Sequence, residues 1–228
     1  MDGAFFFILF ALVAAGAAYL SWYLKQKRRK DLALAARQLG MQFSAADPFA
    51  MLGLPFTLFS KGDGRGLENV MWGSWQGLDV KEFDYWYYEE STDSEGRRSR
   101  SYSRFSCALA EVSLATPHVS IERENLLTRL ADSLGFRDIE FELEEFNRAF
   151  TVKAKDRKFA NDLIDSRMMQ WLLGAGDGWV FEVVGKWVMC YSKRRRPTEL
   201  VPLLGTAKAF LEQVPGVVHE LYGQSAAG

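Results

Sequence analysis

The sequence predicts an α+β protein in which a single N-terminal transmembrane helix is followed by an antiparallel sheet with packed helices. Residues 5–24 contain no charged side chain, and a helix of that length spans the hydrocarbon core of a bilayer. Beyond residue 55, alternating apolar and polar residues predict strands, and apolar residues at helical spacing predict helices. An aromatic content of 14% supplies core-forming surface and argues against disorder.

The charge that follows the apolar run predicts its orientation. Five basic residues lie directly after it: Lys25, Lys27, Arg28, Arg29 and Lys30. Because basic residues favour the cytoplasmic side, we expect a cell-membrane protein with its N-terminus outside and its C-terminal domain in the cytoplasm. A cleaved signal peptide would carry its charge before the apolar core, and a buried helix is rarely apolar on all faces for this length. Both alternatives are therefore less favoured than an anchor.

Three segments divide the chain. Residues 1–30 are expected to be the anchor and its basic linker, residues 31–222 one cytosolic domain, and residues 223–228 a disordered tail. A weak internal sequence similarity leaves open a division of the domain into two strand-hairpin halves, 43–122 and 136–222.

Within the domain, the first expected helix is Asp31–Gly40, which continues from the anchor or begins just after it and stops at Gly40. Further helices are expected at Asn125–Leu134, at Arg157–Leu173 with Asp156 as its cap, and from Thr198 onward. The expected strands are Phe56–Lys61, Leu67–Gln76, Leu78–Glu89, Tyr102–Leu114, Val119–Glu122, Ile139–Leu143, Phe150–Lys155, Trp179–Val184 and Lys186–Ser192. Gly77 and Gly185 are each expected to turn a hairpin, and Ser91–Ser103 to be a polar loop.

Composition and motifs exclude several functions. The formal net charge of -1 creates no global field for nucleic acid, so no nucleic-acid partner is expected. Cys107 and Cys190 are expected to be buried free thiols, and with His118 and His219 they form no metal-ligand spacing. The common catalytic motifs are absent, so we expect no catalytic residue, cofactor or metal.

A cluster of acidic residues is the reason that an enzyme remains the alternative, less favoured functional class. The acidic residues Asp138, Glu140, Glu142, Glu144 and Glu145 could serve a hydrolase-like reaction, although a solvated strand face is the simpler interpretation.

Basic clusters are the more informative signal. Lys25–Lys30 lies next to the membrane, where basic residues attract anionic lipid headgroups, so all five basic residues of this cluster are predicted to face lipid. The other two clusters, Arg97–Arg104 and Lys193–Arg196, either fold back to the same surface or are ordinary solvated turns.

Two sets of residues resemble a family of bacterial, mainly actinobacterial, membrane-anchored proteins known only as a domain of unknown function. The first set is Pro55-Phe56, Phe59-Ser60, Asn69-Val70, Gly73, Gly77 and Phe83-Asp84-Tyr85. The second set is Glu145-Phe146-Asn147-Arg148, Phe150, Val152, Asp156, Ala160, Leu163, Arg167-Met168-Met169 and Leu172-Leu173. The resemblance covers roughly residues 32–192 and implies no catalytic residue, because the family has no established activity.

These observations lead to one functional expectation. The chain is expected to be a single-pass protein whose cytosolic domain mediates lipid or protein contacts at the inner membrane face, with a membrane-tethered enzyme as the alternative. Asn69 and Asp84 are poor strand formers, and each is predicted to fix a turn through a side-chain to backbone hydrogen bond rather than to bind a ligand.

Overall fold

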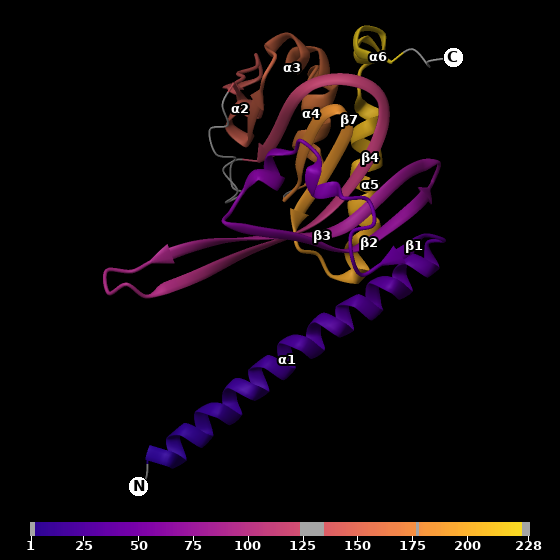
Figure 1. Ribbon diagram of the computed structural model, residues 1–228. Helices are drawn as coiled ribbons and strands as arrows, with labels where there is room; N and C mark the ends of the chain where they lie inside the picture. Colours follow the sequence, from indigo (N-terminus) through magenta and orange to yellow (C-terminus); the bar gives the residue numbers. More distant parts are fainter. Residues whose placement is uncertain (1–2, 124–134, 177, 225–228) are drawn as a thin grey trace.

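One long helix and one antiparallel sheet make up the protein (Figure 1). The computed structural model describes residues 3–123, 135–176 and 178–224. The elements are α1 (Gly3–Gln38), β1 (Gln42–Ser44), η1 (Met51–Gly53), η2 (Thr57–Ser60), β2 (Gly64–Trp75), β3 (Leu78–Thr92), β4 (Arg98–Arg123), β5 (Arg137–Asp138), α2 (Glu144–Ala149), β6 (Phe150–Ala154), α3 (Arg157–Leu163), α4 (Ser166–Gly174), β7 (Val180–Lys193), η3 (Pro197–Glu199), α5 (Leu200–Gln213) and α6 (Gly216–Tyr222). The predicted α+β class, with its N-terminal apolar helix, is confirmed.

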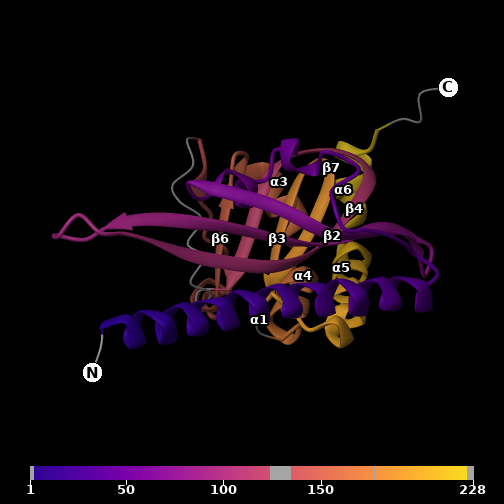
Figure 2. The same cartoon turned by 60° about the horizontal axis from the view of Figure 1, so that its bottom comes forward.

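The anchor and the first helix of the domain are one continuous helix. α1 has 36 residues, about 54 Å at the usual rise per residue. Its N-terminal part is long and apolar enough to cross a membrane and stands clear of the sheet (Figures 1 and 2). Its last turns bury Leu32 and Ala36 in the core. Gly40, with φ of 70°, ends the helix as expected, and the amide of Met41 donates to the carbonyl of Ala36.

Strand β4 organises the sheet. With 26 residues it pairs with β3 along its first part and with β6 along its last part, while β7 follows it on the other edge. The separate strands expected on either side of Pro117 are therefore one strand, with register shifts on both sides of Thr116. The order of the remaining path is β1-β2-β3-β4-β6-β5.

The hairpin of β3 and β4 is longer than the sequence indicated. The expected polar loop Ser91–Ser103 is mostly paired strand, because the ladder continues to Thr92 opposite Arg98. Cross-strand contacts support the extension, since the Tyr102 ring of β4 lies 6.0 Å from the Trp86 ring and 5.5 Å from the Tyr88 ring of β3. The hairpin projects beyond the body of the domain on the same side as the N-terminal part of α1 (Figures 1 and 2).

Gly185 does not turn a hairpin. β7 runs straight through it, and Gly185 sits with φ of 58° opposite Thr116, whose hydroxyl donates to its carbonyl. The sequence cannot distinguish a glycine at a bulge from one at a turn. By contrast, Gln76 and Gly77 form the expected hairpin turn, with φ of 49° and 79°.

Three further expectations were wrong in detail. Phe56–Lys61 forms the short helix η2 rather than a strand, because its apolar side chains pack onto one face of the sheet instead of alternating. The expected helix 157–173 is two helices, since Asp165 caps α4 by accepting from the amide of Met168. Ile139–Leu143 is not a strand, since β5 ends at Asp138. The expected helix at Asn125–Leu134 and the tail after Gln224 lie outside the described residues.

The sheet carries a core on each face. One face is covered by the last turns of α1 and by the helices from α2 to α6, with Phe146, Phe159 and Phe210 fully buried. The other face is covered by η1 and η2, where Phe59, Phe83 and Tyr85 pack together. As predicted, Cys107 and Cys190 are buried free thiols.

Candidate functional site

Arg28 fastens α1 to the sheet. Its Nε donates to Oδ2 of Asp84 at 2.7 Å and its Nη2 to Oδ1 at 2.5 Å, so the pair is bidentate. Nη1 donates to the carbonyl of Arg195 at 2.7 Å. Burial works against the charge of Arg28, but the hydrogen bonds and charge of Asp84 outweigh it and raise the pKa of Arg28 above its ordinary value.

A polar network surrounds Asp84 in the sheet. Asn69 Nδ2 donates to Asp84 Oδ2 at 2.9 Å, and the amide of Arg195 donates to Ser106 Oγ, which lies 3.5 Å from Asp84 Oδ1. Asn69 has φ of 57° at the register shift of β2. The prediction of side-chain to backbone bonds for Asn69 and Asp84 was wrong, because both use side-chain partners.

A second ion pair lies one turn earlier on α1. Lys25 Nζ is 2.6 Å from Glu68 Oε2, and Glu68 faces Asp84 across the ladder of β2 and β3. The two carboxylates therefore lie side by side and receive two cations from the same face of α1. The Lys25 side chain is 52% exposed and that of Arg28 only 11%.

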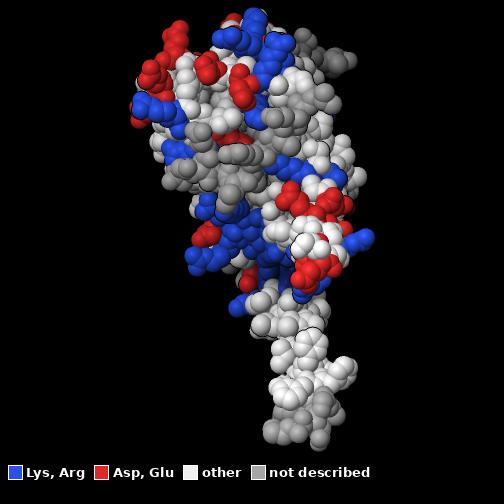
Figure 3. Space-filling model, turned by 90° about the vertical axis from the view of Figure 1, so that its left-hand side faces the viewer, with Lys and Arg blue, Asp and Glu red and all other residues white. Residues whose placement is uncertain are grey.

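Between α1, the base of the hairpin and the segment after β7 lies a pocket of about 740 Å³, which we call the junction pocket. Ser21, Leu24, Lys25 and Arg28 line it from α1, and Trp86, Tyr102 and Arg104 from the hairpin. Glu68 and the segment 194–196 complete it. Figure 3 shows Lys and Arg side chains gathered directly above the uncharged stalk of α1.

Cations outnumber their carboxylate partners in the junction pocket. Arg104 stacks over Tyr102 at 5.0 Å, and Arg195 stacks over Trp179 at 4.5 Å. Neither has a carboxylate within ion-pair distance among the residues that the structure describes. Arg194 lies 4.0 Å from Asp84, which already binds Arg28. Burial lowers the pKa of Arg194; Asp84 opposes this, and the charges of Arg28 and Arg104 add to it.

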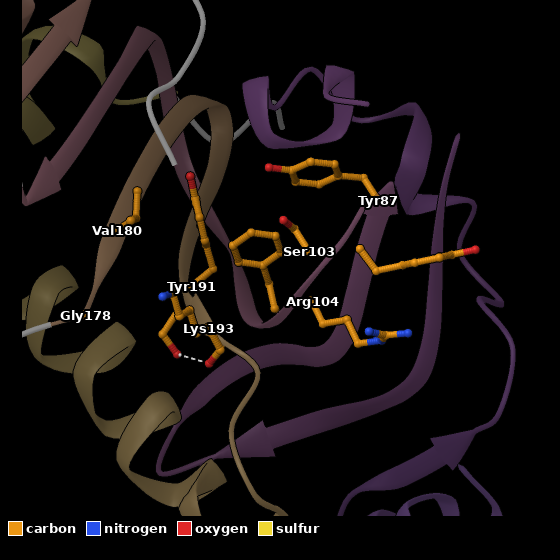
Figure 4. Close-up of a pocket in the computed structure, with 10 residues that line it drawn as sticks. Tyr87, Ser103, Arg104, Gly178, Val180, Tyr191 and Lys193 are labelled. Carbon is orange, nitrogen blue, oxygen red and sulfur yellow. Dashed lines mark hydrogen bonds between the residues drawn. The ribbon is translucent and has the colours of Figure 1, made fainter. Parts of the chain in front are cut away.

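A smaller pocket of about 320 Å³ adjoins the junction pocket and shares Tyr102 and Arg104 with it. Figure 4 shows Tyr87 and Tyr191 on its walls, from β3 and β7, while the side chain of Arg104 extends away from Tyr191. Burial raises the pKa of Tyr191 well above its ordinary value, so its phenol stays neutral, and the lining combines aromatic rings with the cations Arg104 and Lys193.

The predicted lipid-facing residues divide into two groups. Lys25, Lys27 and Lys30 are exposed, whereas Arg28 and Arg29 are half-buried. Arg28 is bound to the domain, because the buried Asp84 needs a cation, and so it is withdrawn from the lipid-facing set.

The other two basic clusters are only partly assembled with Lys25–Lys30. Arg104 and Arg194–Arg196 reach the junction pocket, but Arg97 and Arg100 lie further out on the hairpin and pair with Glu95 and Glu90.

The groups with possible chemistry are not assembled into a catalytic site. Asp138, Glu140, Glu142, Glu144 and Glu145 are all exposed. The described residues contain no group of three potential metal ligands. His118 Nε2 lies 2.6 Å from Glu182 Oε1, a buried pair beside a third pocket of about 390 Å³, but the same Glu182 oxygen accepts from the amide of Thr57 and so positions η2.

Comparison with known proteins finds one with a similar fold. No family model matches the chain, and no curated protein matches it. The chain is similar to the crystal structure of the mycobacterial trehalose monomycolate transport factor A, TtfA. The superposition covers 84% of this chain and 96% of the TtfA chain, with a TM-score of 0.60 and 14% sequence identity. At that identity the likeness establishes a shared fold, and the actinobacterial source of the neighbour agrees with the family resemblance without establishing it.

Proposed function

We propose that this chain is a single-pass, membrane-anchored accessory factor whose domain contacts anionic lipid at the cytoplasmic face. The observation that carries the proposal is the continuity of α1. Leu24, the last residue of the apolar run, and Arg28, which is bound to Asp84, are one helical turn apart. A domain attached in this way is held against the membrane surface without a flexible linker.

The basic residues of the linker other than Arg28 supply the attraction to lipid. Lys25, Lys27, Arg29 and Lys30 follow the apolar run directly, and each basic residue near an anionic surface contributes about 1 kcal/mol. Salt screens this attraction over a distance of about 8 Å at physiological ionic strength.

The structural neighbour suggests the process. TtfA is a trehalose monomycolate transport factor, and the shared fold supports an accessory role for this chain in moving a membrane lipid, alongside another membrane or cytosolic protein. The hydrolase-like alternative has no comparable support, because its acidic residues are exposed and line none of the three pockets described above.

A reporter fused after Gly228 tests the orientation. We expect activity from a reporter that works only in the cytoplasm and none from one that works only outside it. The reverse result would overturn the proposed placement of the domain.

Vesicle binding tests the lipid contact. A chain that begins at Lys25 should bind anionic vesicles weakly and release them as salt rises. Changing Lys25, Lys27, Arg29 and Lys30 to Gln should remove most of this binding, with Arg28 kept so that the fold is preserved. Unchanged binding by that variant would show that other surfaces hold the lipid.

A further inference from the structure

The junction pocket lies at the height where the membrane surface is expected. Its α1 wall begins at Ser21 and Leu24, inside the apolar run, and continues through Lys25 and Arg28. In both ribbon views the hairpin projects on the same side of the body as the N-terminal part of α1 (Figures 1 and 2). On the membrane placement proposed above, the mouth of the pocket therefore opens at the level of lipid headgroups.

The lining combines apolar and aromatic side chains with cations. Leu24 is 54% exposed and Tyr102 45% exposed, and Trp86 also lines the pocket. Six cations share the lining, namely Lys25, Arg28, Arg104, Arg194, Arg195 and Arg196. Indole and phenol rings are suited to the boundary between hydrocarbon and water. The combination matches an amphiphile with an anionic head.

Three of the six cations have no carboxylate of their own, and one of them, Arg195, donates from its Nε to Ser192 Oγ at 2.9 Å. Lys25 is paired with Glu68, Arg28 with Asp84 and Arg196 with Glu199. Arg104, Arg194 and Arg195 each lack a carboxylate of their own among the described residues, since the nearest one to Arg194 is already bound by Arg28. Guanidinium groups present planar, bidentate donors that fit phosphate oxygens. A nearby phosphate would relieve their mutual repulsion.

We propose that the junction pocket binds the phosphate-bearing headgroup of an anionic phospholipid from the leaflet that faces the domain. The sequence separation of its parts explains why the site is not visible as a motif. Arg28 joins α1 to Asp84 and to the carbonyl of Arg195, and the amide of Arg194 donates to the carbonyl of Arg104, so three segments far apart in the sequence meet at the pocket.

The test uses the full-length chain, extracted in detergent and titrated with phosphatidylglycerol, with bound lipid counted by native mass spectrometry. The pocket variant is Arg104→Gln/Arg194→Gln/Arg195→Gln. We expect it to weaken phosphatidylglycerol binding on the order of 100-fold, about fivefold for each residue.

A matched variant separates the pocket from overall charge. Arg137→Gln/Arg148→Gln/Arg157→Gln removes the same three charges from exposed positions on β5, α2 and α3, far from the stalk (Figure 1). We expect it to bind phosphatidylglycerol as the unmodified chain does. Equal loss in both variants would overturn the pocket, because it would show only nonspecific attraction.

A single substitution distinguishes loss of lipid binding from loss of folding. Arg104 is exposed and outside the core, so Arg104→Glu should preserve the thermal unfolding temperature while weakening lipid binding more than tenfold. Normal lipid binding by this folded variant would overturn the proposal.

Two further experiments distinguish a lipid headgroup from a soluble anion, and the pocket from the membrane anchor. Inorganic phosphate at millimolar concentration should fail to displace phosphatidylglycerol, and full displacement would assign the pocket to a soluble anion instead. Flotation of the chain with liposomes tests the anchor separately. A chain that floats but retains no phosphatidylglycerol refutes the pocket alone, whereas a chain that does not float refutes the proposed function and, with it, the lipid assignment.

Discussion

Asp84 and Glu82 lie two residues apart on the same face of β3, yet their surroundings differ. Both are nearly inaccessible, with 4% and 1% of their surface exposed. Asp84 receives Arg28 from α1 and Asn69 from β2. Neither carboxyl oxygen of Glu82 has a hydrogen-bond partner among the described residues. Burial, and then the charge of Asp84, raise the pKa of Glu82 well above its ordinary value.

The difference shows what the anchor helix contributes to the domain. A buried carboxylate needs a cation and hydrogen bonds, while a buried carboxyl without them is held neutral. Arg28 supplies the cation to one position and leaves the other without a partner. The helix that carries the apolar run is therefore part of the folded structure, and the variants below test this interpretation.

Removing Arg28 should have the largest effect. Arg28→Ala leaves Asp84 buried without its cation, so we expect the free energy of unfolding to fall by about 3–5 kcal/mol and the unfolding temperature by on the order of 10 °C. Thermal unfolding of the full chain in detergent measures this. The double variant Arg28→Ala/Asp84→Ala should regain part of the loss, and strictly additive losses would contradict the pairing.

Glu82→Gln should stabilise the protein in a pH-dependent way. Above the ordinary Glu pKa of 4.5, the unfolded chain releases the proton that folded Glu82 keeps. The stability of the unmodified chain therefore falls as pH rises, by about 1.4 kcal/mol per pH unit, until the raised pKa in the folded state is reached. Gln carries no such proton, so the advantage of the variant should grow from pH 5 to 7. Denaturant unfolding at several pH values measures it, and parallel stability curves would show that Glu82 is not held neutral.

Asn69→Ala should come next in size. It removes a donor to Asp84 and places alanine at φ of 57°, so we expect a loss of about 2 kcal/mol. Asn69→Gly keeps the backbone conformation accessible and should cost less. If the two variants were equally stable, the backbone at this bulge would impose no strain. Chemical unfolding of both variants in parallel provides the measurement.

How far the sequence predicts these features depends on the range of the interaction. Gly40, the turn at Gly77 and strand β6 follow from local patterns, and the structure confirms each of them. The continuity of β4 through Pro117 and of β7 through Gly185 does not follow, because pairing on neighbouring strands overrides local turn signals.

The junction pocket was predictable only in part. The three basic clusters are evident in the sequence, but Arg28 and Asp84 are 56 positions apart, and no local pattern joins them. One signal could have suggested a cation for Asp84. An aspartate between aromatic residues on a predicted strand is buried on one face or the other, and a buried carboxylate requires a positive partner.

Lys25→Gln breaks the exposed ion pair of α1, as Arg28→Ala breaks the buried one, and it should have the smallest effect. Lys25 and Arg28 lie on the same face of α1 and pair with carboxylates that face one another on β2 and β3. The Lys25 side chain is half exposed, however, so water compensates both ions when the pair is broken. We expect the free energy of unfolding to fall by less than about 1 kcal/mol, and the effect to vanish at high salt. A loss as large as that of Arg28→Ala would mean that burial does not govern how α1 is attached to the sheet.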